Sequence, residues 1–231
     1  MTSVLRAHDL TKQYGPDVSS RALHGVNLSV HGGSVVAIIG PSGSGKSTLL
    51  NLLSGLDIPS AGRVLYRGRD LAGLNPKERS RFQLNEVGFV FQFFNLIPNL
   101  TAFDNAILPA ILSARRADKR TVVRDLFDEV GLGDKMSLLP SELSGGEQQR
   151  VAIIRAMVND PGVVFADEPT GNLDSKTGDQ IFGLLLDYAR SKARTLVYVT
   201  HERRYADLAD RVLTILDGEI VDDKPNLPKL P

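Results

Sequence analysis

The sequence contains no cysteine. Disulfides and thiolate metal sites are therefore excluded, and a reducing compartment is the natural expectation. The chain also lacks an excess of charge of either sign, because 27 basic residues balance 27 acidic ones. A nucleic-acid partner would then need a local basic patch.

Long hydrophobic runs are missing as well. No apolar run approaches the roughly 18 residues that a membrane-spanning helix needs. Residues 1–10 alternate polar and apolar positions and lack the hydrophobic centre of a signal peptide. We therefore expect a soluble, cytosolic protein whose membrane role would come through a partner. With 231 residues, the chain is long enough for one large domain or one domain with an inserted subdomain.

A glycine-rich loop is the most informative segment that is present. Residues 40–47, GPSGSGKS, have the G-x-x-x-x-G-K-[ST] spacing and follow the apolar run 35–39. Apolar residues then recur every three or four positions between 49 and 56. A buried strand, a glycine-rich loop and a helix in this order are typical of a phosphate-binding loop.

The chemistry of triphosphate binding explains the residue types in this loop. Glycines let backbone N–H groups turn toward phosphate oxygens, and the next helix directs its free N–H groups to the same place. Lys46 can neutralise the β- and γ-phosphates, and the hydroxyl of Ser47 can ligate Mg²⁺. The loop therefore predicts a nucleoside triphosphate site. Its candidate residues are Gly40, Ser42, Gly43, Ser44, Gly45, Lys46 and Ser47.

Two acidic residues close a second buried strand. The apolar run 163–166 ends in Asp167 and Glu168, and adjacent acids at a strand exit can both reach a phosphate site. Asp167 would hold Mg²⁺ or its waters, and Glu168 would take a proton from the water that attacks the γ-phosphate. The alternative is an ordinary acidic turn, which the apolar strand and the upstream phosphate loop disfavour.

A second helix start lies at residues 144–150, SGGEQQR. Ser144 followed three residues later by Glu147 is the pattern of a capping box. That pattern leaves two consecutive glycines unexplained, since each costs about 1 kcal/mol against alanine in a helix. Because a helix start is also an anion site, a symmetric dimer could place this one over the nucleotide of the other chain.

The order of strand-like and helical segments predicts a parallel α/β sheet around the phosphate loop. A helical subdomain at about 92–159 would interrupt a core made of about 1–91 and 160–224, with 225–231 as a tail. Expected strands are 4–9, 26–30, 35–39, 64–66, 163–166, 195–200 and a hairpin over 211–221, and expected helices are 119–136, 144–159 and 175–190.

Together these motifs resemble the ATP-binding-cassette (ABC) ATPase family, in the family's order and spacing and over essentially the whole chain. The resemblance implies a P-loop NTPase fold, in which a mainly parallel RecA-like core sheet carries an N-terminal antiparallel β-subdomain and an inserted helical subdomain. It also implies an ATPase that uses ATP and Mg²⁺ and closes as a head-to-tail homodimer around two nucleotides.

Further site residues follow from this resemblance. Tyr14 resembles the aromatic residue that stacks on adenine, and Thr48 ends the Walker A match near the α-phosphate. Gln92 resembles the glutamine that contacts Mg²⁺ and the attacking water, and His201 resembles the switch histidine that holds the γ-phosphate. Asp174 resembles the aspartate at the dimer seam.

The family's signature motif is matched by residues 144–148, where Ser144, Gly146 and Glu147 would cap the partner's γ-phosphate. Glu147 stands where many members have glutamine, which puts the contact to the partner's ribose in question, and Glu202 stands where aspartate is frequent. Neither departure removes a group needed for hydrolysis. The expected catalytic residues are Lys46, Gln92, Glu168 and His201, and the expected metal ligands are Ser47, Gln92 and Asp167.

Residues 141–150 and 167–175 are similar to the branch that contains lipoprotein-releasing (Lol-type), macrolide-export (MacB-like) and FtsE-type cassettes. For this branch the resemblance implies an integral membrane permease as partner, no nucleic acid, and a peripheral location on the cytoplasmic side of the inner membrane. The alternative for the apolar segment after Gln92, that it is core of the helical subdomain, stays open. The candidates to receive the permease are Phe93, Phe94, Leu96 and Ile97.

Two hypotheses from other classes remain. One is a soluble ABC ATPase acting on DNA or ribosomes, but the chain has one cassette, no heptad run, no zinc insertion and balanced charge. The other is a regulatory module that holds ATP without turnover, which the presence of Glu168 disfavours. Detectable ATP hydrolysis would exclude this second hypothesis.

Overall fold

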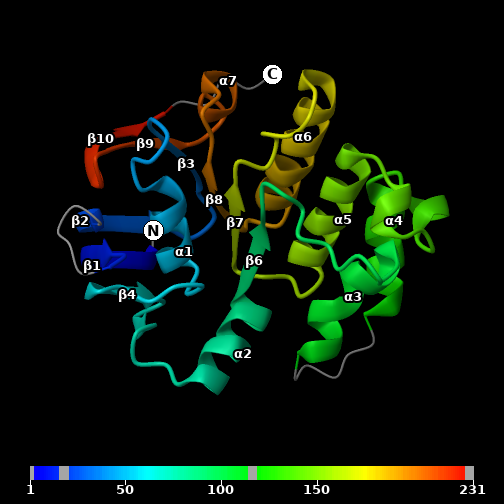
Figure 1. Cartoon of the computed structure of the whole chain (residues 1–231), viewed down its shortest axis with the longest axis horizontal. Helices are drawn as coiled ribbons and strands as arrows, with labels where there is room; N and C mark the ends of the chain where they lie inside the picture. The colour runs from blue at the N-terminus through cyan, green and yellow to red at the C-terminus, as the bar shows by residue number, and fades with distance from the viewer. Residues whose placement is uncertain (1–2, 16–20, 114–118, 227–231) are drawn as a thin grey trace.

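The computed structural model describes residues 3–15, 21–113 and 119–226, which form two sheets and a set of helices (Figure 1). The smaller sheet has four antiparallel strands in the order β2-β1-β4-β5, and the larger has six in the order β10-β9-β3-β8-β7-β6. In the larger sheet β9, β3, β8, β7 and β6 are parallel, and β10 pairs antiparallel with β9. The predicted α/β fold with an antiparallel N-terminal sheet is confirmed.

The bounds of the elements are as follows. The smaller sheet contains β1 (Ser3–Gln13), β2 (Arg21–His31), β4 (Ala61–Tyr66) and β5 (Arg69–Asp70). The larger sheet contains β3 (Val35–Ile39), β6 (Val87–Val90), β7 (Val163–Asp167), β8 (Thr195–Val199), β9 (Arg211–Leu216) and β10 (Glu219–Pro225). The helices are α1 (Lys46–Leu53), α2 (Pro76–Glu86), α3 (Ala102–Leu112), α4 (Arg120–Glu129), α5 (Gly145–Met157), α6 (Ser175–Ser191) and α7 (Arg203–Ala206), with short 3-10 turns η2 (Gly133–Lys135) and η3 (Pro140–Glu142).

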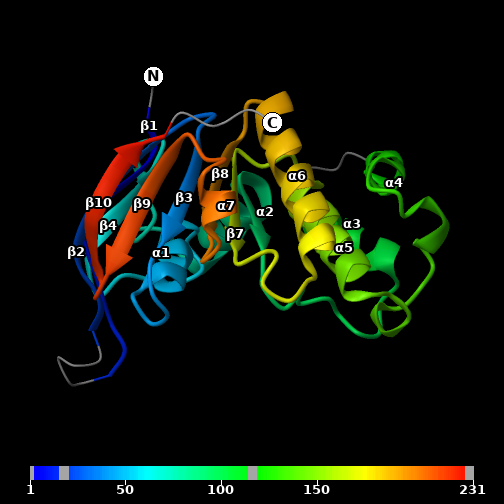
Figure 2. The ribbon, with the colours of Figure 1, turned by 90° about the horizontal axis from the view of Figure 1, so that it is seen from above.

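The central strands of the larger sheet are apolar because both of their faces are covered. Val36 and Ile38 of β3 belong to the core shared with α1 and the smaller sheet. Val35 and Ala37, the alternate residues, belong to the core shared with α6. Figure 2 shows α1 and α6 on opposite sides of β8. Parallel strands between two layers are therefore continuous apolar runs, as the phosphate-loop strand is in the sequence.

A third apolar core holds α3, α4 and α5 together, away from the smaller sheet (Figure 1). Val123 and Phe127 of α4 are completely buried in it. Helix α5 links this group to the larger sheet, because Ile154 belongs to the third core and its neighbour Ile153 to the core around α6. The helical segment expected between β6 and β7 is thus attached to the sheet largely through α5.

Periodicity in the sequence missed three helices, α2, α3 and the short α7, and misjudged several ends; the helix expected over 119–136 ends at Glu129. Helix α2 buries only Phe82, so it has no apolar stripe to detect, and α3 contains Pro109, which normally signals a helix break. Helix α1 ends at Leu53, and Leu56, expected on its apolar face, is 44% exposed. Pro225, expected in the tail, is the last residue of β10; residues 227–231 of that tail lie outside the described residues.

None of the helices in the described ranges combines the length and the apolar character needed to cross a membrane.

Candidate active site

The loop between β3 and α1 is built from glycines with positive φ. Gly40, Gly43 and Gly45 have φ values of 152°, 78° and 101°. A Cβ at Gly40 would lie 2.1 Å from the carbonyl oxygen of Ile215, and one at Gly45 would lie 2.5 Å from that of Ala22. Glycine is therefore needed both for the backbone turn and for the close approach of neighbouring strands.

Helix α1 begins without a side-chain cap, because its N-cap residue is Gly45. Lys46 is 7% exposed, and its Nζ donates to the carbonyl oxygen of Pro41 at 2.7 Å, so the ammonium lies across the loop. The Oγ of Ser44 is buried without a hydrogen-bond partner. Uncapped N–H groups, an ammonium and an unpartnered hydroxyl in one loop fit an anionic ligand such as a phosphate chain.

A hydroxyl and a carboxylate meet beside this loop. The Oγ of Ser47 donates to Oδ1 of Asp167 at 3.0 Å. Burial raises the pKa of Asp167, and the charge of Glu168 acts in the same direction, whereas the bond from Ser47 and the charge of Lys46 oppose the rise. The ionised form of this partly buried carboxylate would be stabilised by a nearby cation. Together with the Ser47 hydroxyl oxygen, it forms a set of oxygen donors that fits Mg²⁺.

Glu168 follows Asp167 with a strained backbone. Its φ is 44°, a conformation that costs a non-glycine residue about 1 to 3 kcal/mol and is frequent at functional sites. The N–H of Glu168 donates to the carbonyl oxygen of Val199 at the end of β8 at 3.1 Å. Nδ1 of His201, two residues after β8, lies 3.4 Å from Oε2 of Glu168. Adjacent parallel strands thus bring the predicted base and the predicted switch histidine together.

Gln92, two residues after the end of β6, lies near the same carboxylate. A Cβ on Gly171 would lie 3.2 Å from Nε2 of Gln92 and 3.5 Å from Oε2 of Glu168, so both side chains border the same space. Nδ2 of Asn172 donates to the carbonyl oxygen of Gln92 at 2.8 Å and holds this loop in place. The structure therefore brings Ser47, Gln92, Asp167, Glu168 and His201 into one cluster beside the phosphate loop.

The predicted signature segment starts α5 with a closed capping box. The N–H of Ser144 donates to Oε2 of Glu147 at 2.8 Å, and the N–H of Glu147 donates to Oγ of Ser144 at 3.4 Å. Glu147 also pairs with Lys135; this bond and those from Ser144 lower the pKa of Glu147 to about 2. A Cβ at Gly146 would lie 2.4 Å from Cγ2 of Thr177. Close packing against α6 therefore explains one of the two glycines.

Of the four remaining predicted residues, Ser42 is exposed in the phosphate loop, Thr48 lies in the first turn of α1, and Asp174 and Tyr14 lie at element ends. Asp174 caps α6, accepting from the N–H of Thr177 at 3.0 Å. Tyr14 follows β1, is 50% exposed, and donates its phenol O–H to Oδ2 of Asp57 at 3.0 Å. Burial raises the pKa of Tyr14 and the Thr48 side chain opposes the rise, so the phenol lies beside the first turn of α1.

Two polar residues of α5 that the sequence analysis did not single out connect this helix to the catalytic loops. Gln149 is fully buried, and its Nε2 donates to the carbonyl oxygen of Pro169 at 2.7 Å. Arg155 donates to the carbonyl oxygens of Phe94 and Asn95, which have φ values of 52° and 51°. For Gln149 the sequence did contain a signal, because position 149 shares the apolar face of the helix with positions 153 and 156, and a polar residue on such a face needs a buried partner.

The predicted permease-docking residues divide into two groups. Phe93 is 69% exposed and Ile97 is 42% exposed. Leu96 instead packs against the helical core, as the alternative supposed, and Phe94 is half-buried, with its carbonyl oxygen 2.7 Å from Nη2 of Arg155. Only Phe93 and Ile97 of the four therefore present large apolar surface.

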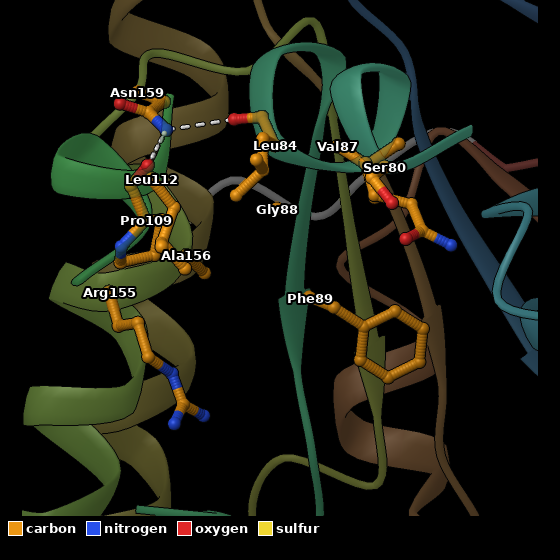
Figure 3. A pocket seen from close by; sticks show the side chains of 11 residues that line it. Ser80, Leu84, Val87, Gly88, Phe89, Pro109, Leu112, Arg155, Ala156 and Asn159 are labelled. Atoms are coloured by element: carbon orange, nitrogen blue, oxygen red, sulfur yellow. Dashed lines mark hydrogen bonds between the residues drawn. The ribbon is translucent and has the colours of Figure 1, made fainter. Parts of the chain in front are cut away.

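A cavity of about 360 Å³ opens between α2 and β6 on one side and α3 and α5 on the other (Figure 3). Nδ2 of Asn159 bridges these walls by donating to the carbonyl oxygens of Leu84 at 2.8 Å and Pro109 at 3.0 Å. Leu112, which lines the cavity, and Ile111 are 62% and 64% exposed. Neither exposed residue was predicted from the sequence, because α3 itself was not predicted.

Comparisons with known proteins complete the description of the site. A family model described as "ABC transporter" matches residues 23–171, well over half of the chain. The chain belongs to the ABC transporter family. It is 44% identical over 227 residues to the lipoprotein-releasing system ATP-binding protein LolD of Xanthomonas oryzae pv. oryzae (strain MAFF 311018), a match that covers 97% of this chain and 93% of the relative. It is 42% identical to LolD of Cytophaga hutchinsonii over 222 residues, or 96% of this chain and all of the relative.

Solved ABC cassettes share the fold as well. The dimeric post-hydrolysis structure of the ATP-binding cassette MJ0796 with ADP and Pi superposes with a TM-score of 0.87 at 38% identity, covering 96% of this chain and 98% of that one. The predicted family and ATPase activity are therefore confirmed: the chain is the ATP-binding and ATP-hydrolysing subunit of an ABC transporter. The roles of individual site residues and the use of Mg²⁺ stay predictions.

Proposed function

We propose that this ABC ATPase is the energising subunit of a lipoprotein-releasing transporter, bound as a homodimer to a membrane permease on the cytoplasmic side of the inner membrane. The observation that carries the proposal is the 42% to 45% identity to LolD proteins along nearly the whole chain. No observation favours action on DNA or ribosomes, or a module without turnover.

The chain's own groups account for ATP binding. The glycine-rich loop and the uncapped first turn of α1 present N–H groups to the phosphates, and Lys46 supplies the positive charge. The hydroxyls of Ser44 and Thr48 flank the same turn, and the exposed ring of Tyr14 is available to stack on adenine.

Ser47 and Asp167, 3.0 Å apart, are the residues that would hold Mg²⁺, with Gln92 as a further ligand. The ion, when bound, would neutralise charge on the phosphate oxygens.

Hydrolysis requires a base, a group that orients water and a group that holds the γ-phosphate. Glu168 takes a proton from water as the water oxygen bonds to the γ-phosphorus, and the bond to the bridging oxygen breaks to release ADP. The amide of Gln92, which borders the same space, orients the water. His201, 3.4 Å from Glu168, would hold a γ-phosphate oxygen. The strained backbone of Glu168 is consistent with a position kept for chemistry.

A dimer would complete the site with the signature helix. Helices α1 and α5 lie on opposite sides of β7 in both overall views (Figures 1 and 2). A two-fold pair can bring the α5 start of one chain to the phosphate loop of the other, and the solved cassette MJ0796 forms a dimer. Ser144, Gly146 and Glu147 would then contact the partner's nucleotide, with Asp174 at the seam.

The permease would dock on the exposed apolar side chains before and at the end of α3, of which Leu112 also lines the cavity of Figure 3. Phe93 and Ile97 precede α3, and Ile111 and Leu112 end it. Arg155 connects this surface to α5, because its guanidinium binds the backbone immediately after Phe93.

The test is to capture the partner. Tagged Glu168→Gln protein, which should hold ATP without hydrolysing it, is expressed in its native cells, extracted in mild detergent with Mg-ATP, and analysed by mass spectrometry. A polytopic membrane protein in stoichiometric amount is the expected result. A matched Phe93→Asp/Ile97→Asp variant in the same background should lose it and still bind ATP. Ribosomal or DNA-associated proteins without a membrane protein would overturn the proposal.

The cargo is tested by depletion of the chain. If it energises lipoprotein release, lipoproteins should accumulate in the inner membrane. A normal lipoprotein distribution accompanied by macrolide sensitivity or a division defect would instead place the chain with the export or FtsE-type cassettes.

A further inference from the structure

The adenine-stacking candidate Tyr14 is attached to a polar network on the loop after α1. Its phenol O–H donates to Oδ2 of Asp57 at 3.0 Å. The other carboxylate oxygen of Asp57 accepts from Nζ of Lys12 at 2.7 Å and from the N–H of Ile58 at 2.7 Å. Lys12 and Asp57 are largely shielded, with side chains 13% and 28% exposed. The carboxylate is therefore held from two sides while it anchors the phenol.

Lys12 also acts directly on the aromatic ring. Its Nζ lies 4.9 Å from the ring centroid of Tyr14, within the range of a cation–π contact. Burial opposes ionisation of Asp57, yet the bonds from Lys12, from the N–H of Ile58 and from Tyr14 together lower the pKa of its carboxyl group. Asp57 is therefore an anion at neutral pH, and an anionic acceptor makes a stronger hydrogen bond to a phenol.

We infer that Asp57 and Lys12 are positioning residues for nucleotide binding, which hold the half-exposed ring of Tyr14 in the orientation needed to stack on the base. The inference rests on the proposed role of Tyr14. A ring that is already ordered loses less rotamer freedom when the base binds, and the affinity is correspondingly higher.

The network reaches the phosphate loop through the helix that it follows. The N–H of Asp57 donates to the carbonyl oxygen of Asn51 in α1 at 3.1 Å. This bond fixes the position of Asp57 relative to the helix that begins at the phosphate loop. Base contact and phosphate contact are thereby fixed relative to each other by one element.

The loop is also joined to β1 by bonds that do not involve the Asp57 carboxylate. The N–H of Ser60 donates to the carbonyl oxygen of Thr11 at 2.9 Å, and the N–H of Gln13 donates to Oγ of Ser60 at 3.1 Å. These bonds join the loop to β1 independently, so a variant at Asp57 should keep the loop and the phosphate site. Loss of the carboxylate is therefore expected to act on the ring of Tyr14.

The experiment compares ATP with inorganic tripolyphosphate, which lacks the base, by isothermal titration calorimetry on the full chain. Asp57→Ala should weaken ATP binding about three- to tenfold, the range of one lost hydrogen bond, and leave tripolyphosphate binding unchanged. Tyr14→Phe should weaken ATP binding at least as much, because it also removes the contact with the Thr48 side chain, and the double variant should lose no more than Tyr14→Phe alone. The ATP affinity of Asp57→Asn, which keeps an acceptor oxygen, should lie between those of the wild type and Asp57→Ala. The control Asp222→Ala removes a surface carboxylate paired with Lys224 and should change neither affinity.

Tyr14→Ala separates this inference from the proposed function. If Tyr14→Ala leaves the ATP affinity unchanged, Tyr14 does not bind the base, and both its proposed stacking role and the positioning inference are wrong. If it weakens ATP binding while Asp57→Ala and Tyr14→Phe do not, Tyr14 binds the base without help and only the positioning inference is wrong. Equal weakening of ATP and tripolyphosphate in Asp57→Ala would also overturn it, because the residue would then support the loop in general.

Discussion

Helices α1 and α5 both begin where the proposed site needs backbone N–H groups, but they begin in opposite ways. The N-cap of α1 is Gly45, in the left-handed region and without a capping side chain. The start of α5 is closed by Ser144 and Glu147, each accepting the other's N–H. The loop before α1 is held from outside instead, since the N–H of Gly218, in the turn between β9 and β10, donates to the carbonyl oxygen of Ser44 at 3.0 Å.

The difference shows what each site depends on. The capping box of α5 is closed by two residues three positions apart, so this part of the helix start can form from its own sequence, although Glu147 also pairs with Lys135 and Gly146 packs against Thr177. The start of α1 leaves its N–H groups for a ligand and relies on packing by β2 and β9, far away in the sequence. Substitutions at the start of α1 should therefore impair folding and binding together, whereas a substitution at Gly146 of α5 should be open to compensation at one side chain of α6.

The largest expected effect is on hydrolysis and leaves ATP binding at the two helix starts intact. Glu168→Gln removes the proposed base and should lower kcat about 10²- to 10⁴-fold, which corresponds to roughly 3 to 5.5 kcal/mol of barrier, with ATP affinity retained. Steady-state hydrolysis and the Kd for ATP measure the two quantities, for the chain alone and with its permease. A variant that kept a tenth or more of the wild-type rate would show that Glu168 is not the base.

The next effect tests the dependence of α1 on distant packing. Gly45→Ala should cost at least about 2 kcal/mol of unfolding free energy, because its φ of 101° strains any side chain and its Cβ would lie 2.5 Å from a backbone oxygen. Urea unfolding measures this cost. Gly43→Ala is the matched control, since φ is 78° there but no atom lies within 4 Å, so only the strain of about 1 to 2 kcal/mol remains. Equal losses would argue against the packing explanation.

A change in α6 should compensate for substitution of the corresponding glycine of α5. Gly146→Ala gains about 1 kcal/mol in helix propensity, but its Cβ would lie 2.4 Å from the Thr177 methyl carbon, so the single variant should be net destabilised. Thr177→Ser removes that methyl group, and the double variant should recover the stability lost by the single one. Urea unfolding of the three variants tests this. A double variant no better than Gly146→Ala would mean that the glycine serves another purpose.

The smallest effect concerns the pH dependence of the capping box. The pKa of Glu147 is lowered to about 2, chiefly by Lys135. Ionised Glu147 therefore contributes its full stabilisation at pH values above the ordinary glutamate pKa, and this contribution is lost as the pH falls from about 5 toward 2. Glu147→Gln should remove this part of the acid dependence and lower stability slightly at pH 7, because the pair is partly exposed. The midpoint of urea unfolding across this pH range is the measurement; identical profiles would contradict the assignment.

The phosphate loop and the acidic pair were visible in the sequence because each is a short pattern attached to a buried parallel strand. An apolar run covered on both faces stands out, and the polar residues at its exit are then placed at the carboxyl edge of the sheet. Residues such as Asp57, Gln149 and Arg155 had no such pattern. Each acts on a backbone or side-chain group that lies at least 20 residues away in the sequence.

The sequence alone determined the fold class, the nucleotide-binding chemistry and the family, because these depend on local spacing and on hydrophobic periodicity. Tertiary structure decided which of the apolar candidates after Gln92 are exposed, why Gly146 must be small, and how Tyr14 is held. Each of these depends on which distant elements come within a few ångströms, and that is set by packing of the three cores rather than by neighbours along the chain.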